Sequence, residues 1–262
     1  MSVKLFFWNV RDLNDPDKHK PFVDWLSSQK PLFGALLETH IKEPFLHPII
    51  TKICYGRKYL SNHFSDPGGR IILIWKEPLV VQLLSQTRQQ LTCSITLPNQ
   101  TPIIYTAIYA SNLSDERVEF WNDILLNHSA LDLETKNWVV GGDFNQILFP
   151  LEHSNPAVDH TDSLMYQLQD CFLQAGLFDL RYLGPCHSWT NNQPESPIAK
   201  KLDRLLVNNT TISSYPHAVA SFLPQETSDH TPCLLNLALF LPKTGTYPYK
   251  FQNYLTKHPG FA

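Results

Sequence analysis

The sequence predicts a layered α/β protein. Short apolar runs with strand-like composition recur along most of the chain, and a few amphipathic segments of helical length separate them. The length of 262 residues suits one large α/β domain or two small ones. Aromatic residues make up 12% of the chain, which excludes a disordered protein.

The first half of the chain is mainly strands. Strands at residues 4–10 and 32–37 flank an amphipathic helix over residues 17–29. Pro, Gly and Asn residues punctuate the runs that follow and separate them into individual strands. Further strands are predicted at residues 59–64, 70–75, 79–84, 91–97 and 103–109.

The second half alternates helices and strands. Ser114 is the predicted N-cap of a helix that runs to about Asn127, since Asp115 and Glu116 fill its first turn. A second helix over residues 163–175 is expected to stop at Gly176. Residues 148–162, which precede this second helix, are predicted to form a Pro-containing loop. The remaining strands are predicted at residues 138–140, 187–190, 202–207, 218–222 and 233–239.

Composition limits the class of protein. We expect one domain over residues 1–240, followed by a linker or tail over 241–262 that carries three lysines and no acidic residue. The formal net charge of −3 argues against a generally basic nucleic-acid coat protein but allows a local basic face. No apolar run approaches the roughly 20 residues of a membrane helix, and no signal peptide is expected. Five widely spaced cysteines favour reduced thiols over a disulfide framework.

Polar residues that could carry chemistry lie at the ends of apolar strands. Each one taken alone also fits a solvated strand end or a turn. Taken together they are less easily explained, because four carboxylates lie beside apolar sequence and would repel one another without a cation. The set comprises Asn9, Glu38, Tyr109, Asn112, Asp143, Asn145, Asp203, Asp229 and His230.

The residue types in this set indicate a reaction class. Carboxylate and amide oxygens without a thiolate suit Mg²⁺, with Mn²⁺ as an alternative ion. His230 is the natural proton-transfer group, and a neighbouring carboxylate would fix its tautomer. The asparagines and Tyr109 are neutral groups able to hold phosphate oxygens. These residues predict metal-assisted hydrolysis of a phosphoester.

Six sequence motifs follow one another over about residues 4–240. They are Trp8-Asn-Val-Arg11, Leu37-Glu-Thr39, Ile108-Tyr-Ala-Ser-Asn112, Gly141-Gly-Asp-Phe-Asn145, Leu202-Asp-Arg204 and Ser228-Asp-His230. Together they are similar to the endonuclease/exonuclease/phosphatase superfamily, and the resemblance implies a four-layer α/β/β/α sandwich.

The segments Pro185-Cys-His-Ser-Trp-Thr-Asn191 and Lys201-Leu-Asp-Arg-Leu-Leu-Val-Asn208, and the tail, resemble the endonuclease domain of plant LINE-type (non-LTR) retrotransposons. In that group the tail leads to a reverse transcriptase.

The resemblance implies a role for each metal-site and catalytic position. Glu38 would bind the metal, Asn9 would support that site, and Asp229 would complete the metal network. Asp143 would position or activate the attacking water. Asp203 would orient His230, which would act either as a base toward water or as a stabiliser of the phosphate; both roles stay open.

Other positions are implied to contact the substrate. Tyr109 and Asn145 would contact the scissile phosphate, and Asn112 the DNA backbone. Ser188 falls where relatives carry a Ser or Thr that touches phosphate. Arg11 is a basic residue that could contact the DNA phosphates. It stands where apurinic/apyrimidinic endonucleases have an acidic residue. That difference argues against specificity for abasic sites.

Two departures from the motifs and a set of basic residues complete the prediction. Asp12 stands where the plant elements usually have Gly; a positive φ there would make Asp12 cost roughly 1 kcal/mol. His187 stands where many relatives have Phe. Basic residues that could form a DNA-binding rim, or simply a solvated surface, are Arg11, Arg70, Lys200, Lys201 and Arg204.

The expected function is Mg²⁺-dependent nicking of one DNA strand by in-line attack of water. A monomer that binds the DNA backbone and no membrane is expected, and the resemblance implies an intracellular, nuclear location. Two alternatives stay open. The same constellation could hydrolyse RNA or another phosphoester, or the chain could be a catalytically decayed remnant that binds nucleic acid.

Overall fold

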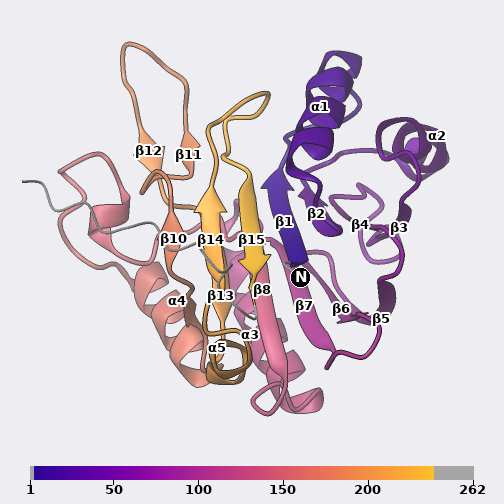
Figure 1. Ribbon diagram of the computed structural model, residues 1–262. Helices are drawn as coiled ribbons and strands as arrows, with labels where there is room; N and C mark the ends of the chain where they lie inside the picture. The colour runs from indigo at the N-terminus through magenta and orange to yellow at the C-terminus, as the bar shows by residue number, and fades with distance from the viewer. Residues whose placement is uncertain (1–2, 239–262) are drawn as a thin grey trace, which may run out of the picture.

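Two β-sheets pack face to face in the computed structural model, which describes residues 3–238 (Figure 1). The first sheet has seven strands in the order β10-β14-β15-β1-β2-β4-β3. Only β1–β2 and β10–β14 are parallel pairs in it, and its other neighbours are antiparallel. The strands are β1 (Val3–Asn9), β2 (Phe33–Leu37), β3 (Lys58–Ser61), β4 (Ile71–Trp75), β10 (Tyr182–Leu183), β14 (Val219–Phe222) and β15 (Cys233–Leu237).

The second sheet has six strands in the order β5-β6-β7-β8-β13-β9, and its one parallel pair is β7–β8. A separate two-stranded hairpin, β11–β12, projects at the top of Figure 1. The strands of the second sheet are β5 (Val80–Gln86), β6 (Gln90–Thr96), β7 (Ile103–Tyr109), β8 (Asn137–Asp143), β9 (Phe178–Asp179) and β13 (Asp203–Val207), and the hairpin joins β11 (Trp189–Thr190) to β12 (Ala199–Lys200).

Alternating side chains of the central strands explain the layers. In β1, Leu5 and Phe7 point into the core between the sheets, where they share a cluster with Tyr105 of β7. Phe6 and Trp8, on the opposite face of β1, pack in a different cluster with residues of the covering helices. Both faces of these strands are therefore buried, which is why their sequences are continuously apolar.

Helices cover the outer face of each sheet. Helices α1 and α2 cover the first sheet, and α3 and α4 cover the second. The predicted four-layer α/β/β/α sandwich is therefore confirmed. The helices are α1 (His19–Gln29), α2 (Glu43–Ile53), α3 (Ser114–Ala130), α4 (Ser163–Gln174) and α5 (Asn209–Ser214), with 3₁₀ turns η1 (Pro16–Lys18) and η2 (Pro150–Glu152).

Two helices were not predicted from the sequence. Helix α2 contains Pro48 in its interior and Pro44 in its first turn, so its sequence resembles a loop. The short helix α5 follows Asn208, whose side chain accepts a hydrogen bond from the Thr211 backbone. The prediction missed this cap because one turn of helix has almost no periodicity to detect.

Several predicted boundaries were wrong. Ser114 is the first residue of α3, and the N-cap is Leu113, without a side-chain cap. The helix predicted from residue 17 begins at His19, after the turn η1. The strand predicted at residues 138–140 is longer in the structure and covers all of β8. It continues through Gly141 and Gly142, since glycine fits where neighbouring strands pack closely. Gly176 ends α4 with a φ of 63°, as predicted.

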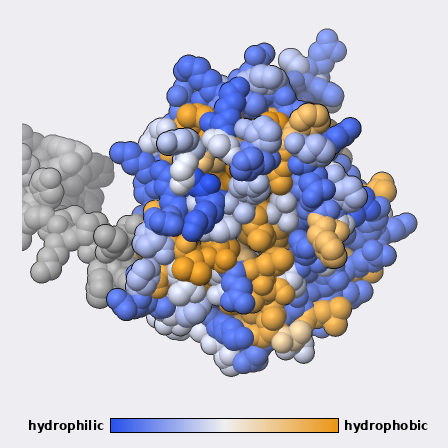
Figure 2. Space-filling model, turned by 90° about the vertical axis from the view of Figure 1, so that its right-hand side faces the viewer, coloured by the Kyte–Doolittle hydropathy of each residue, from blue (hydrophilic) through white to orange (hydrophobic). Residues whose placement is uncertain are grey.

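Figure 2 shows the face that carries α2, β3 and β5, on which apolar residues gather. Val80 and Leu83 of β5 and Phe45 of α2 are among the exposed apolar side chains of these elements. Strand β5 lies at the edge of its sheet and is paired on one side only, so part of its apolar sequence stays at the surface. The predicted tail, residues 241–262, lies outside the described residues, as does Leu239 of the last predicted strand.

Candidate active site

The chemistry-bearing residues converge at one edge of the two-sheet sandwich. Asn9 ends β1, and Asp143 ends β8 in the facing sheet. Asp203 begins β13 and pairs in register with Asp143, because the two strands are antiparallel neighbours. His230 lies three residues before β15, the strand next to β1. Four strand ends from two sheets thus meet at one point.

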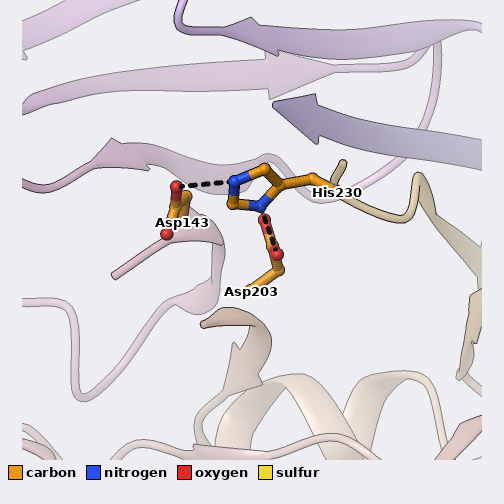
Figure 3. A group of neighbouring side chains, drawn as sticks. All are labelled: Asp143, Asp203 and His230. Carbon is orange, nitrogen blue, oxygen red and sulfur yellow. Dashed lines mark hydrogen bonds and ion pairs between the residues drawn. The ribbon is translucent and has the colours of Figure 1, made fainter. Parts of the chain in front are cut away.

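A buried group of three side chains forms the centre of this site (Figure 3). The Nδ1 atom of His230 lies 2.8 Å from Oδ2 of Asp203, and its Nε2 lies 3.7 Å from Oδ2 of Asp143. Figure 3 shows the imidazole between the two carboxylates, one facing each ring nitrogen. The Asp203 carboxylate accepts a hydrogen bond from the Nδ1–H group, so it fixes the orientation of the ring.

Asn9 links the histidine group to Glu38. Its Nδ2 atom lies 2.9 Å from Oε2 of Glu38 and 2.9 Å from Oδ2 of Asp143, and it is 3.3 Å from Nε2 of His230. One buried amide therefore holds two carboxylates close together beside the imidazole. This convergence brings together five of the residues selected from the sequence.

The site's electrostatics follow from burial and from the crowding of carboxylates. Burial opposes the charged imidazolium, but the negative charges of Asp203, Asp143 and Glu38 outweigh it and raise the pKa of His230 to about 9. Burial also raises the pKa of Asp143, and the positive charge of His230 opposes this shift. Burial raises the pKa of Tyr109, helped by the charges of Glu38 and Asp143. The site therefore has excess negative charge that a cation would neutralise.

Local backbone geometry explains the glycine pair of the Gly141-Gly-Asp-Phe-Asn145 motif. A Cβ on Gly142 would lie 2.0 Å from the carbonyl oxygen of Ile108, and its φ is 155°. A Cβ on Gly141 would lie 2.7 Å from the Phe7 ring in the facing sheet. Only glycine, which has no Cβ, allows the backbone to pack this closely against both neighbours. This close packing determines how deeply the adjacent Asp143 is buried.

Three residues of the site adopt backbone angles that are uncommon for residues other than glycine, and one of them is Arg11, with a φ of 46°. Glu38 has a φ of 54°, directly after β2, and Asn145 has a φ of 48°. The Asn145 backbone donates to Oδ1 of Asp143 at 2.9 Å, and its side chain donates to the Ala110 carbonyl at 2.7 Å. Such strained positions concentrate at functional sites.

Asp229 lies in a different set of contacts from the metal-site carboxylates. Its Oδ2 accepts hydrogen bonds from the Arg11 guanidinium and, at 2.8 Å, from the indole nitrogen of Trp189. Asp229 is buried, whereas the Arg11 side chain is 58% exposed. Asp229 thus holds Arg11 and Trp189 at the mouth of the site.

A polar cleft of about 320 Å³ opens over this group. Asn112 and Asn145 line it, as do Arg11 and Lys200, and His230 lies at its base. Tyr109 is buried beside the cleft, with the Arg70 guanidinium 5.6 Å above its ring. The cleft therefore presents amide and cationic donors around the carboxylate and imidazole groups.

Ser188 lies beneath the cleft surface. It is 2% exposed, and its hydroxyl accepts hydrogen bonds from the backbone of Leu202 at 3.1 Å and of Asp203 at 2.9 Å. These two hydrogen bonds hold the backbone at Asp203 in place. The contact with phosphate that the resemblance implied stays a prediction.

Three residues that sequence reasoning did not single out support the site. Trp189 lines the cleft, and Lys200 lies 5.7 Å from its ring centroid. Ser228 donates to the Asn9 carbonyl at 2.7 Å, and Trp8 donates to the His230 carbonyl at 3.2 Å. All three residues belong to the motifs quoted above, so the sequence could have indicated them. Their roles depend on contacts between distant segments of the fold, which the motifs do not show.

Two of the five proposed basic rim residues are buried. Arg204 is fully buried and pairs with Glu152 and Asp179, and Lys201 pairs with Asp179 at 2.9 Å. Their assignment to a possible DNA-binding rim was therefore wrong. Arg204 in β13 and Lys201 just before it turn inward, where they join three segments of the chain. Arg11 and Lys200 line the cleft, and Arg70 pairs with Asp66 at 2.7 Å.

The donor set fits a hard divalent cation. Glu38 and Asp143 converge on one amide of Asn9, and the ligand atoms of Asp143, Asp203 and His230 lie within 4.8 Å of one another. The Oδ1 atom of Asp203 is buried and accepts no hydrogen bond from the part of the chain that the structure describes. Carboxylate oxygens in a buried, negatively charged site suit divalent cations. Glu38 and Asp143 are the residues that would hold one.

The chain belongs to the Endonuclease/Exonuclease/phosphatase family, whose sequence profile matches residues 6–230. It is thus a member of a family of hydrolytic enzymes that comprises nucleases and phosphatases. No helix among residues 3–238 has the length and apolar character needed to cross a membrane.

Solved structures with the same fold include a retrotransposon endonuclease. The endonuclease domain of TRAS1, a telomere-specific non-LTR retrotransposon, is 12% identical, with a TM-score of 0.68 over 90% of this chain and 98% of that one. The apurinic/apyrimidinic endonuclease LMAP from Leishmania major is 15% identical, with a TM-score of 0.72 over 90% and 87% of the two chains. TDP2 from D. rerio, complexed with a single-strand DNA product, is 14% identical, with a TM-score of 0.62 over 90% and 98%. The predicted resemblance to a non-LTR retrotransposon endonuclease domain is confirmed in the fold.

Proposed function

We propose that this protein is a divalent-metal-dependent phosphodiesterase that nicks one strand of DNA, with Mg²⁺ as its ion. One observation carries the proposal: His230 lies between the carboxylates of Asp203 and Asp143 beside the Asn9–Glu38 pair, at the base of a donor-lined cleft. That arrangement combines a proton-transfer group, carboxylates for a metal and donors for phosphate. Similarity in fold to nucleases that act on DNA supports the choice of substrate.

The two carboxylates that flank His230 have different roles in the proposed mechanism. Asp203 accepts a hydrogen bond from Nδ1–H and keeps the ring oriented, so Nε2 is the atom that exchanges a proton or hydrogen-bonds the phosphate. Asp143, on the Nε2 side, orients the attacking water in line with the leaving oxygen. Glu38 and Asp143 would hold the cation, which would neutralise charge that develops on the phosphate.

The cleft residues hold the substrate backbone. Arg11 presents its guanidinium at the mouth, and Asn112 and Asn145 offer amides to nonbridging phosphate oxygens. Such contacts recognise phosphates rather than bases. DNA binding should therefore weaken as the salt concentration rises.

Nicking of supercoiled plasmid tests this proposal. The purified full chain is incubated with Mg²⁺, with Mn²⁺ and with chelator, beside His230→Ala and Asp143→Ala; Lys58→Ala, an exposed residue paired with Glu77, is the matched control. We expect metal-dependent conversion to open circles by the wild type and Lys58→Ala, and none by the two site variants. No conversion by folded wild-type protein would contradict DNA nicking. A parallel assay on single-stranded RNA would then separate an RNA hydrolase from a decayed remnant.

A further inference from the structure

A second polar cavity, of about 350 Å³, adjoins the catalytic cleft. The two share four lining residues, Asn112, Asn145, Lys200 and Leu202. The cavity therefore continues the cleft past the two asparagines. A strand whose scissile phosphate lies over His230 would pass this cavity with its next nucleotide.

Arg117 forms the floor of this cavity. It is 6% exposed, and its guanidinium donates to the carbonyls of Ser111 at 2.9 Å and Asn112 at 3.0 Å, and to the Gln146 side chain at 3.3 Å. Its Nε atom is buried and has no hydrogen-bond partner among residues 3–238. A buried guanidinium with an unused N–H group is costly unless something else pairs with it.

His153 and Lys200 add donors on the rim. The backbone of Asn155 donates to Nδ1 of His153 at 2.9 Å, so a neutral His153 carries its proton on Nε2 and is a donor there. Burial and the charge of Lys200 lower the pKa of His153, which keeps the ring neutral near pH 7. The one acidic residue in the cavity lining, Asp162, has an oxygen committed to the Met165 backbone at 2.8 Å.

We propose that this cavity, hereafter the Arg117 cavity, is a subsite for the substrate phosphate next to the scissile one. An anion there would lie among the side chains of Arg117, His153 and Lys200, which all line this cavity. His153 and Lys200 would donate to it, and the positive charge of the buried Arg117 guanidinium would stabilise it. Phosphate fits this surplus of donors better than a neutral ligand. The inference rests on the proposed function, since it assumes a phosphodiester substrate.

Binding of dinucleotides tests the subsite without catalysis. The full chain in chelator is titrated calorimetrically, at low salt, with thymidine dinucleotides that carry a terminal 5′ phosphate, a terminal 3′ phosphate or none. We expect one phosphorylated form to bind about tenfold more tightly than the unphosphorylated one. Which end gains affinity gives the direction of the strand across the cleft.

Variants assign that gain to the Arg117 cavity. His153→Ala and Lys200→Ala should reduce the advantage of the terminal phosphate, whereas Lys58→Ala should leave it unchanged. Arg117→Met should abolish it; since Arg117 is buried, its melting temperature is measured in parallel, and the two rim variants keep the test valid if it does not fold.

Three outcomes would overturn the subsite. The terminal phosphate could add no affinity, its effect could persist in both rim variants, or removal of the terminal base could remove the gain while the phosphate remains. The last result would assign the cavity to a nucleobase. Because no turnover is needed, a failure of the subsite is distinguishable from a failure of DNA nicking, which the plasmid assay measures.

Discussion

The imidazole of His230 bonds to the carboxylate of Asp203 across the two sheets, with Nδ1 and Oδ2 2.8 Å apart. Asp203 belongs to β13 of the six-stranded sheet, and His230 precedes β15 of the seven-stranded sheet. The hydrogen bond therefore forms only when the sheets are packed. It couples assembly of the sandwich to assembly of the site.

Removing either partner should disable catalysis without unfolding the protein. We expect His230→Ala and Asp203→Asn to lower the single-turnover nicking rate by about 10² to 10⁴, the usual contribution of a positioned general acid or base. Circular dichroism checks the fold. Near-wild-type nicking by folded Asp203→Asn would show that orientation of the imidazole is unimportant here.

Stability of the metal-free protein should fall between pH 6.5 and 9. The pKa of His230 is about 9 in the fold against 6.5 as its ordinary value, so its contribution is complete below pH 6.5 and is lost as the pH rises through 9. The difference in unfolding free energy between wild type and His230→Asn should shrink by about 3 kcal/mol over that range. Urea denaturation in chelator measures it. A pH-independent difference would contradict the charged His230.

Metal binding should depend on Glu38 and not on Asp229. Glu38→Gln should weaken Mn²⁺ binding, measured by electron paramagnetic resonance, by more than about tenfold, because it removes a carboxylate held beside Asp143. Asp229→Asn should retain Mn²⁺, since the Asp229 carboxylate bonds to Arg11 and Trp189. Equal loss in both variants would place Asp229 among the ligands, as the sequence resemblance implied.

The backbone at Asp12 should prefer glycine. The φ of Asp12 is 77°, in the left-handed region that favours glycine. Its side chain accepts a hydrogen bond from the Asn14 backbone at 2.7 Å. Asp12→Ala and Asp12→Gly lose the same hydrogen bond, so their difference isolates the backbone. We expect Asp12→Ala to be less stable than Asp12→Gly by about 1 kcal/mol in urea denaturation. Equal stabilities would show that the left-handed angle carries no strain.

Two glycines with positive φ should respond differently to a methyl group. Gly142→Ala should destabilise by about 3 kcal/mol or more, because the new Cβ would meet the Ile108 carbonyl at 2.0 Å. Gly56→Ala, with a φ of 71° and open space around it, should lose only about 1 kcal/mol. Thermal unfolding of both variants measures the contrast. Similar losses would mean that backbone angle, not packing, explains the glycine pair.

The sequence by itself determined the fold class and most of the residues that meet around His230. Short apolar strands separated by a few helices predicted a layered sandwich, and the ordered motifs resembled a superfamily with a four-layer fold. Polar residues at strand ends predicted the group around His230. These signals are local, because periodicity and strand ends are properties of neighbouring residues. Helix α2 escaped prediction since Pro48 masks its periodicity.

Only the tertiary structure decided which polar residues share a contact. Arg204 and Lys201 are basic residues of the kind that a DNA-binding surface carries, yet in the fold both are buried and pair with Asp179. Asp229 follows the motif of a metal-site residue, yet its carboxylate holds Arg11 and Trp189. Charge and residue type can be taken directly from the sequence. Whether a side chain is buried, and which residue it contacts, depends on how two sheets built from distant segments of the chain pack together. That packing leaves no pattern among neighbouring residues of the sequence.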